Sequence, residues 1–331
     1  MRSLSAYLCT LLMAVVAMVP ASAAWGSAVS VEASSVNIAL PAAPVNPGPG
    51  RGFTTMAPWV TYYGESTTTN LATLASTFRV INIDVDPAGT FTPAQVTQLK
   101  NKGANRVLSY MNIGSCESFR TYWKSVPTGF ESCEANTAAQ LGKYNGYANE
   151  VWMNPANAAY QNLILNYVAP RLVAQGIDGF FLDNMEIVTH GTATTNGPCN
   201  AACSQGGLNL VGLLRAKYPK LLIVMNNATS SVTLNGSANG TPFANLLDGI
   251  VAESVYLPTY NGESEQALEN WTGRKLKPGG LSFFIGTLDY VTACTQANAN
   301  TARTDYTRSR SLGFSPYVAT SSLQAVCYWG F

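Results

Sequence analysis

The sequence predicts one (β/α)8 barrel with disulfide-bearing loops, and three observations lead to that prediction. Eight short runs rich in apolar, β-branched and aromatic residues recur along residues 55–331 of the 331-residue chain. Turns and helical stretches separate them, as in a parallel sheet covered by helices. No G-x-G-x-x-G motif follows the first run and no G-x-x-x-x-G-K-[ST] motif occurs, which disfavours the doubly wound nucleotide-binding sheet that is the alternative.

The expected elements follow from the order of these runs. The expected strands are Trp59–Tyr63, Val80–Val85, Arg106–Asn112, Ile177–Asp183, Leu221–Asn227, Gly249–Ser254, Leu281–Leu288 and Gly313–Ala319. The expected helices are Asn70–Thr77, Pro93–Lys102, Ala156–Gln175, Leu208–Lys217, Pro242–Leu247, Glu263–Arg274 and Ala297–Ser311. Proline suits the first turn of a helix and glycine the position after its end, which is where Pro93, Gly103 and Gly176 fall.

The N-terminal segment predicts export. Residues 1–23 combine one arginine, an apolar core and the small residues Ala21, Ser22 and Ala23 of a signal-peptidase site. A membrane anchor is the alternative, but the apolar run is short and no cationic flank follows it. We therefore expect a signal peptide over 1–23, a Pro/Ala-rich tail over 24–54 and the barrel over 55–331. The mature protein is expected to be a secreted, extracellular monomer without a membrane segment.

The charge balance excludes nucleic acid as an expected partner. The chain has 19 basic and 18 acidic residues, and removing the leader takes away Arg2 and no acid, which leaves 18 of each. Binding to a phosphate backbone needs a basic surface that this composition does not provide. Only 11% of the residues are charged, which is common in secreted proteins that meet polymers outside the cell.

The cysteines indicate disulfides rather than a metal site. Six cysteines remain after the leader, and an even number in an exported chain suggests a disulfide framework with fifteen possible pairings. The simplest pairings are local: Cys116–Cys133, Cys199–Cys203 and Cys294–Cys327. No second Cys or His pair stands near Cys199 and Cys203, and His190 is the only histidine, so we expect no metal and no cofactor.

One stretch, Gly176–Ile187 (GIDGFFLDNMEI), ends a buried strand in polar groups. A carboxylate such as Asp183 is costly to bury there unless it is hydrogen-bonded or used, and capping of the next helix is the alternative. Glu253 ends the sixth expected strand in the same way. Because alternate strands contribute to one layer of a barrel, Asp183 and Glu253 are expected to face each other across its mouth.

Other strand ends supply amides, acids and phenols to the same mouth. Carboxyl groups that move protons, polar groups that hold hydroxyls and aromatic faces that stack on sugars are the components of a carbohydrate cleft. Beside the acids, the predicted substrate-binding residues at strand ends are Tyr63, Asp84, Asn112, Asn184, Asn226, Asp289 and Tyr317. Glu186 and His190 fit a loop surface better. The long insert Ser115–Asn154 is expected to form a wall of the cleft.

These segments resemble a known family. The runs YYGESTTTNLATLASTFRVINIDVD, LSYMNIGSCESFRTYW, GIDGFFLDNMEI and IVAESVY are similar to the endo-α-1,4-polygalactosaminidases of glycoside hydrolase family 114. The resemblance covers roughly residues 55–320. It implies a (β/α)8 barrel, Asp183 and Glu253 as the catalytic acids, and Tyr63, Asp84 and Glu117 along the cleft. The chain departs from the family pattern at Glu150–Asn154, where many members have an acidic W-L-D-like stretch.

The resemblance implies endo-cleavage of α-1,4-linked galactosamine or N-acetylgalactosamine polysaccharide. The pairing of acids from the fourth and sixth expected strands separately suggests retention of configuration, for which the carboxyl groups should lie about 5 Å apart. An acidic cleft fits a cationic polymer even when the protein as a whole is neutral. Two alternatives remain at this point. One is a wall-associated barrel protein that binds carbohydrate without catalysis, and the other is a barrel hydrolase that acts on another polysaccharide.

Overall fold

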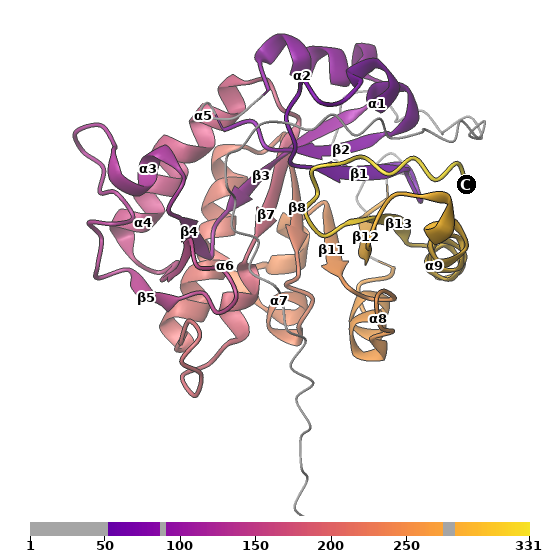
Figure 1. The fold of residues 1–331 in the computed structure, drawn as a ribbon. Helices are drawn as coiled ribbons and strands as arrows, with labels where there is room; N and C mark the ends of the chain where they lie inside the picture. The colour runs from indigo at the N-terminus through magenta and orange to yellow at the C-terminus, as the bar shows by residue number, and fades with distance from the viewer. Residues whose placement is uncertain (1–51, 87–90, 274–281) are drawn as a thin grey trace, which may run out of the picture. The chain divides into compact units, whose positions relative to one another are not determined.

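Eight parallel strands form the central sheet of the computed structural model, which describes residues 52–86, 91–273 and 282–331 (Figure 1). In spatial order these strands are β1 (Trp59–Tyr62), β2 (Val80–Ile83), β3 (Arg106–Asn112), β7 (Gly179–Asp183), β8 (Leu222–Asn226), β11 (Gly249–Glu253), β12 (Phe284–Val291) and β13 (Ser315–Thr320). The indole N–H of Trp59 donates to the carbonyl oxygen of Ser315 at 2.7 Å, which brings the first and last strands together. The sheet is thus a nearly closed (β/α)8 barrel.

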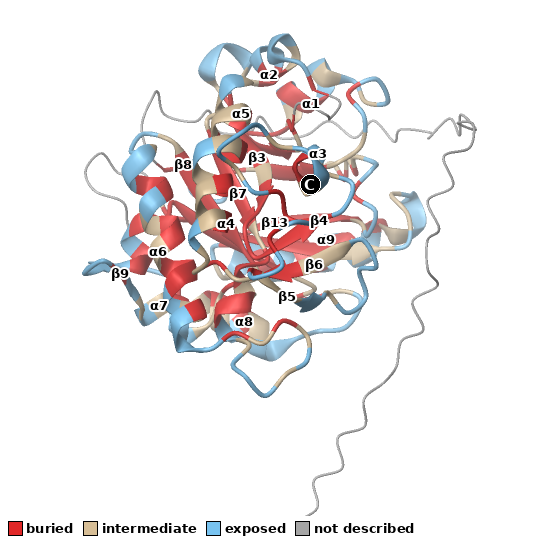
Figure 2. Ribbon diagram, turned by 90° about the vertical axis from the view of Figure 1, so that its left-hand side faces the viewer, coloured by how far each residue is buried: buried red, intermediate tan, exposed pale blue. Residues whose placement is uncertain are grey.

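The strand sequences account for this arrangement. Nearly every residue of these strands is buried, as expected for parallel strands that are covered on both faces. Figure 2 shows the buried strands at the centre, with the exposed positions on the outer sides of the helices and on loops. Inside, Trp59 packs against the rings of Phe181, Phe284 and Tyr317.

Helices occupy most of the connections between these strands. They are α1 (Leu71–Thr77), α2 (Pro93–Leu99), α4 (Ala158–Leu163), α5 (Ala169–Ala174), α6 (Ala201–Lys217), α7 (Ser231–Asn235), α8 (Gly262–Glu269) and α9 (Ala299–Ser311). Short 3₁₀ helices lie at Asn101–Gly103, Met185–Thr189, Phe243–Leu246 and Gln296–Asn298. The N-terminus of α2 has a full capping box, in which Thr92 and Gln95 satisfy each other's backbone N–H groups.

Three expected helices differ in detail. The stretch expected over 156–175 is interrupted by a π-helical turn, Ile164–Val168, with Pro170 at the start of α5. The stretch expected over 242–247 is a 3₁₀ helix. Helix α6 begins seven residues before the expected start, where the Asn200 side chain caps it by accepting from the backbone N–H of Cys203. Gly206 lies within this helix, and a Cβ there would come within 2.3 Å of the Ala156 methyl group.

The insert between β3 and β7 folds into its own small sheet. Strands β4 (Ser115–Glu117), β6 (Glu150–Met153) and β5 (Gln140–Lys143) pair antiparallel in that order, with a short helix α3 (Thr121–Lys124) after β4. A two-stranded ribbon, β9 (Ser237–Ala238) with β10 (Thr241–Pro242), follows α7. The insert was expected as a loop at the mouth, and its strands were not predicted.

Three disulfides join Cys116 to Cys133, Cys199 to Cys203 and Cys294 to Cys327, which are the local pairings that the spacing suggested. The first links β4 to the segment that follows α3. The second closes the start of α6, and the third fastens the C-terminal segment near the end of β12. Each therefore restrains a loop or terminus rather than the barrel itself.

The expected signal peptide and nearly all of the expected tail lie outside the described residues. At the tail's end, Phe53 is already fully buried, pairs with Ser282 in a β-bridge and packs on Phe284 at 5.1 Å between ring centroids. The chain therefore joins the barrel core before residue 55. Among the described residues, we find no helix with both the length and the apolar character needed to cross a bilayer.

Candidate active site

Three neighbouring strands bring Asp183, Asn226 and Glu253 together, since each residue ends its strand: β7, β8 and β11. The Nδ2 atom of Asn226 donates to Asp183 Oδ1 at 2.9 Å and to Glu253 Oε1 at 2.5 Å. One amide nitrogen thus bridges the two acids. The separation of Asp183 Oδ1 and Glu253 Oε1 therefore cannot exceed the sum of these two distances, so the two acids meet at the mouth of the barrel.

Glu253 is held by two further donors. The Nδ2 atom of Asn227 donates to Oε1 at 3.1 Å, and the hydroxyl of Tyr290 donates to Oε2. The backbone N–H of Glu253 in turn donates to Asn227 Oδ1 at 3.0 Å. Asn227 has φ 56°, a left-handed conformation that asparagine tolerates better than most residues. The strand-end Asn-Asn pair therefore orients both acids.

Asp183 accepts hydrogen bonds from the Tyr110 hydroxyl and the Asn184 backbone as well as from Asn226. The Tyr110 ring packs edge to face against Tyr63 at 5.2 Å, and the Tyr63 hydroxyl accepts a bond of 2.8 Å from Asn82. Negative charge from Asp183 and Glu253 contributes to a raised pKa of Tyr63, after the larger effect of burial. Tyr63 therefore lies beside the acid pair.

Two more carboxyl groups lie beside this pair. Burial and then the charge of Asp183 raise the pKa of Glu186 to about 8. Burial and then the charge of Glu117 raise the pKa of Glu150 to about 7. Asp183 itself has a pKa raised to about 6, by burial and then by Glu253. These shifts arise because like charges share a site with little water.

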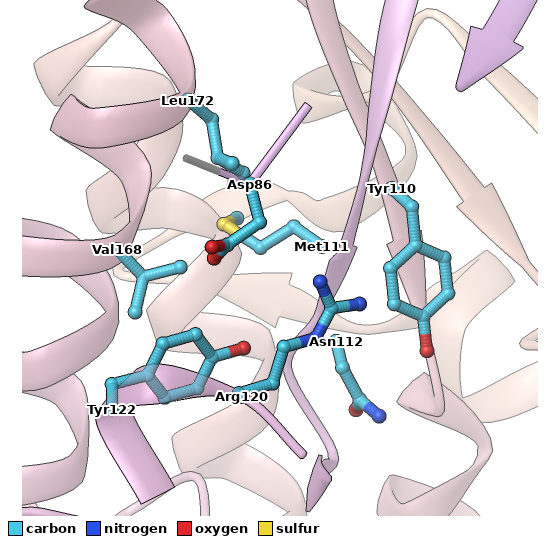
Figure 3. A pocket seen from close by; sticks show the side chains of 8 residues that line it. All are labelled: Asp86, Tyr110, Met111, Asn112, Arg120, Tyr122, Val168 and Leu172. Carbon is cyan, nitrogen blue, oxygen red and sulfur yellow. The ribbon is translucent and has the colours of Figure 1, made fainter. Parts of the chain in front are cut away.

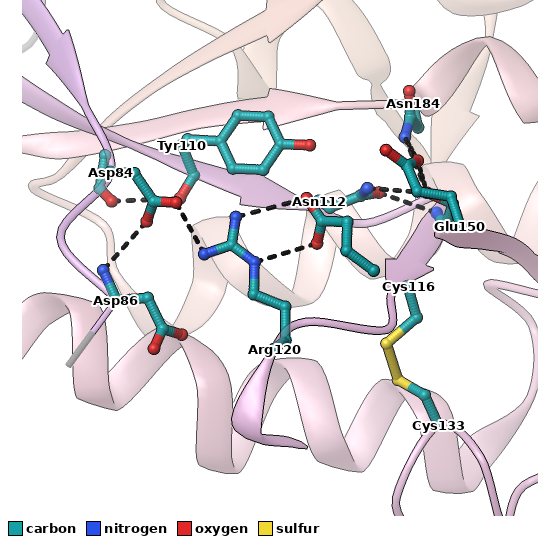
Figure 4. A network of polar contacts seen from close by, with 12 residues as sticks. Asp84, Asp86, Tyr110, Asn112, Cys116, Arg120, Cys133, Glu150 and Asn184 are labelled. Atoms are coloured by element: carbon teal, nitrogen blue, oxygen red, sulfur yellow. Dashed lines mark hydrogen bonds and ion pairs between the residues drawn. A yellow bond between two sulfur atoms is a disulfide. The ribbon is translucent and has the colours of Figure 1, made fainter. Parts of the chain in front are cut away.

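Asn184 and Asn112 hold the insert against the barrel mouth. Asn184 donates to Ser115 Oγ at 2.8 Å and to Glu150 Oε2 at 3.2 Å, while Asn112 accepts from the backbone N–H of Ser115 at 2.8 Å (Figure 4). Close approach is also required at Gly114, where a Cβ would come within 1.8 Å of the Asn184 carbonyl oxygen. Asn112 and Asn184, both predicted to bind substrate, therefore make hydrogen bonds to the insert.

Asp84 and Glu117 are joined through Arg120, a residue that the sequence analysis did not single out. Arg120 donates to Asp84 Oδ2 at 2.7 Å and to Glu117 Oε2 at 3.1 Å (Figure 4). Its guanidinium also lies 5.4 Å from the centroid of the Tyr110 ring. The three charged groups connect the insert to the barrel, and Glu117 is only 2% exposed. Asp84 and Glu117 therefore share Arg120 as an ion-pair partner.

A small hollow lies beside Arg120, between β3 and the helices that follow the insert (Figure 3). It is lined by Asp86, Tyr110, Met111, Asn112, Arg120, Tyr122, Val168 and Leu172. Side chains fill it so closely that no water molecule fits. The hollow is therefore packing behind the site rather than a place for substrate.

Two predicted residues have side chains that are buried inside the protein. Asp289 is fully buried and accepts from the backbone N–H groups of Tyr256 at 2.6 Å and Leu257 at 2.9 Å, so it fixes the loop after β11. Tyr317 is also fully buried, and its hydroxyl accepts from the Cys327 N–H at 3.1 Å. Strand ends contribute side chains to the core as well as to the mouth, and alternation along a twisted strand does not distinguish these positions from sequence.

The residues that sequence reasoning missed come from the insert and from strand interiors. Tyr110 precedes Asn112 by two positions and so shares its side of β3, which was an available signal. Glu150, Tyr144 and Tyr147 lie in the insert, whose fold no periodicity indicated. Among residues 52–86, 91–273 and 282–331, no group of His, Cys, Asp and Glu side chains has an arrangement that fits a metal ion.

Paired acids at the carboxyl ends of parallel barrel strands define the site of a glycosidase-type barrel. The chain belongs to the glycoside-hydrolase family GH114, whose sequence profile matches residues 38–330. The protein is therefore a glycosidase, and the expected family is confirmed. An uncharacterized protein of Thermotoga maritima is 24% identical over 256 residues, which are 73% of each chain.

Two solved structures share the fold. One is the glycoside hydrolase domain of PelA from Pseudomonas aeruginosa, with a TM-score of 0.59, 18% identity, and coverage of 82% of this chain and 97% of that domain. The other is Ega3 from Aspergillus fumigatus in complex with galactosamine, with a TM-score of 0.58, 16% identity, and coverage of 86% and 97%. At these identities the likeness establishes the barrel, which agrees with the predicted fold class.

The raised pKa values predict that stability falls as pH rises. Asp183, Glu150 and Glu186 titrate in the folded protein near pH 6, 7 and 8, against ordinary values of 3.8 and 4.5. The folded state then holds protons that the unfolded chain releases, so the unfolding free energy decreases from about pH 5 to pH 8. Urea unfolding at half-unit pH intervals measures this slope.

The variant Glu186→Gln isolates one of these groups. Its unfolding free energy is expected to decline less steeply between pH 6 and 8, by up to about 1.4 kcal/mol per pH unit, because glutamine binds no proton. Glu263→Gln is the control, since Glu263 is an exposed residue in the first turn of α8. An unchanged slope in the Glu186 variant would contradict the placement of that carboxyl beside Asp183.

Proposed function

We propose that this protein is a secreted endo-α-1,4-polygalactosaminidase that cleaves α-1,4-linked galactosamine or partly N-acetylated galactosamine polymer with retention of configuration. Asp183 acts as the nucleophile and Glu253 as the general acid and base. Asp183 attacks the anomeric carbon while Glu253 gives its proton to the leaving glycosidic oxygen. Water, deprotonated by Glu253, then hydrolyses the glycosyl-enzyme ester and releases Asp183.

The observation that carries the proposal is the shared donor, Asn226. Because its Nδ2 atom lies 2.9 Å from Asp183 Oδ1 and 2.5 Å from Glu253 Oε1, those oxygens can be separated by no more than the two distances together. That limit fits the separation of about 5–5.5 Å in retaining glycosidases and not the roughly 6.5–9.5 Å of inverting ones. A water molecule placed for direct displacement would not fit between them.

The charge of the site supports a cationic substrate. Asp183, Glu253, Glu150 and Glu186 form no ion pair with a lysine or arginine in the part of the chain that the structure describes. Amino sugars without acetyl groups carry positive charge near neutral pH and would relieve the repulsion among these carboxyl groups. The galactosamine bound to Ega3, a protein with the same fold, points to the same substrate class.

Reducing-end release from a panel of polymers tests the proposal. The panel contains polygalactosamine, its N-acetylated form, chitosan and an α-glucan. We expect new reducing ends from the galactosamine polymers and fragments of intermediate length early in the reaction, as endo cleavage requires. NMR spectra of the first product should show the α-anomer. Binding without reducing ends would instead indicate a carbohydrate-binding protein, and an initial β-anomer would contradict retention.

A further inference from the structure

The turn between β5 and β6 presents an exposed aromatic ring at the mouth of the barrel. Tyr147 lies in this turn and is 57% exposed, although most large aromatic side chains in the described residues are buried. Gly146 next to it has φ 90°, a left-handed conformation that glycine adopts without strain and that lets the turn reverse. The ring belongs to neither the barrel core nor the acid pair.

A stack of aromatic side chains supports this ring from below. The centroid of Tyr147 lies 4.7 Å from that of Tyr144, whose ring in turn stacks on Trp152 at 4.1 Å and 22° between planes. Trp152 is 1% exposed, and the His190 ring packs edge to face against it, with 4.8 Å between ring centroids. Stacked rings have few rotamers, so Tyr147 stands on a rigid base. The single histidine of the chain thus serves packing.

Asn196 fixes this base to the barrel. Its Oδ1 atom accepts from Trp152 Nε1 at 2.7 Å and from the backbone N–H of Asn145 at 2.9 Å. The adjacent Gly197 lies so close that a Cβ would approach the Trp152 ring to 2.5 Å. Asn196, in the loop after β7, therefore binds both Trp152 and the turn that carries Tyr147. These contacts restrain the position of the turn.

The tyrosine that supports this ring contacts a carboxyl group of the site. The Tyr144 hydroxyl donates to Glu186 Oε1 at 3.3 Å, and Glu186 follows Asp183 by three residues. Burial and then the negative charge of Glu253, Glu150 and Asp183 raise the pKa of Tyr147, which places its phenol within the electrostatic reach of the site. An exposed, rigidly supported ring next to a glycosidase acid pair is suited to the apolar face of a sugar.

We propose that Tyr147 is a substrate-binding subsite: a hexosamine ring adjacent to the bond that is cleaved stacks on its aromatic face. The inference rests on the proposed function for the identity of the sugar and deepens it by assigning a subsite. Polymer bound in this way spans the insert and the barrel, so Tyr147 contributes to binding of oligomers more than to the chemical step. The hydroxyl is not required, because the contact is made by the ring.

The test is calorimetric binding of sugar hexamers to the Asp183→Asn protein, which we expect not to turn them over. The probes are hexamers of α-1,4-linked galactosamine, β-1,4-linked glucosamine and β-1,4-linked N-acetylglucosamine. Adding Tyr147→Ala is expected to weaken binding of the galactosamine hexamer by about tenfold, the scale of losing one aromatic contact. Tyr147→Phe should bind within about twofold of its parent, because it keeps the ring.

Phe119→Ala is the matched control, since Phe119 is 66% exposed on the same insert but lies against Arg120 rather than the acids. It should leave the affinity unchanged. An unaltered affinity in Tyr147→Ala, or an equal loss in Tyr147→Phe or in Phe119→Ala, would overturn the subsite. If the Asp183→Asn protein binds only a glucosamine hexamer, the proposed substrate is wrong. The effect of Tyr147→Ala is then measured with that hexamer. A parent that binds none contradicts both.

Discussion

The Asp183→Asn protein is expected to keep its fold and lose about 10⁴-fold or more of its kcat/KM on galactosamine polymer. Asparagine has nearly the shape of aspartate and can still accept from Asn226 and Tyr110, but its amide cannot form the glycosyl ester. Loss of a carboxyl group with a raised pKa also removes a source of repulsion. Reducing-end assays measure the first effect, and thermal unfolding at pH 8 measures the second.

The Glu253→Gln protein separates the two roles. It should lose a similar factor on the natural polymer yet still form the glycosyl ester from a dinitrophenyl glycoside, because that leaving group needs no proton. Azide should then accelerate its turnover and yield a product with retained configuration. If azide instead rescues Asp183→Asn to a retained product, the roles of the two acids are exchanged. An Asp183→Asn protein that cleaves the natural polymer at the parent rate without azide would contradict the mechanism in either assignment.

Replacing Asn226 by leucine is expected to lower kcat by about 10²–10³-fold, the usual cost of one preorganised donor in an active site. Asp183 and Glu253 would each lose a hydrogen bond, because one Nδ2 atom donates to both. That donor favours the ionised form of Asp183, so its removal raises the pKa of Asp183 above about 6. The acid limb of the kcat/KM profile should therefore move to higher pH.

Asn105→Leu provides the control for this pH shift. Asn105 is equally buried, and its Nδ2 atom also makes two hydrogen bonds, to the carbonyl oxygens of Ala75 at 2.7 Å and Leu99 at 2.8 Å. Its loss should reduce stability without moving the acid limb. A limb that stays in place in Asn226→Leu, or that moves equally in Asn105→Leu, would show that the bridging amide does not set the protonation of the acids.

The barrel and its acid pair were accessible to sequence reasoning because both have a local signature. Apolar runs identify buried parallel strands, and the residues that end them point to one mouth by the topology of the fold. Asp183 and Glu253 were selected in this way, and the structure brings them together through Asn226. Whether they carry the reaction stays a prediction until the variants above are assayed.

The less successful expectations share one cause. Asp289 and Tyr317 also end or lie near the ends of strands, but their side chains are buried among backbone amides and aromatic rings. Their chemical types are the same as those of cleft residues. Only the direction of the side chain distinguishes them, and that direction depends on the twist and register of neighbouring strands, which no local pattern reports.

By itself, the sequence determined the number and order of the barrel strands and the pair of acids, and it suggested the local disulfide pairing that the structure has. These properties follow from burial and chain proximity, which act over a few residues. The tertiary structure decided the rest: the bridge made by Asn226, the binding of Asp84 and Glu117 to Arg120, and the support of Tyr147 by Tyr144 and Trp152. Such contacts join segments far apart in the chain, and their geometry exists only after the insert has packed on the barrel.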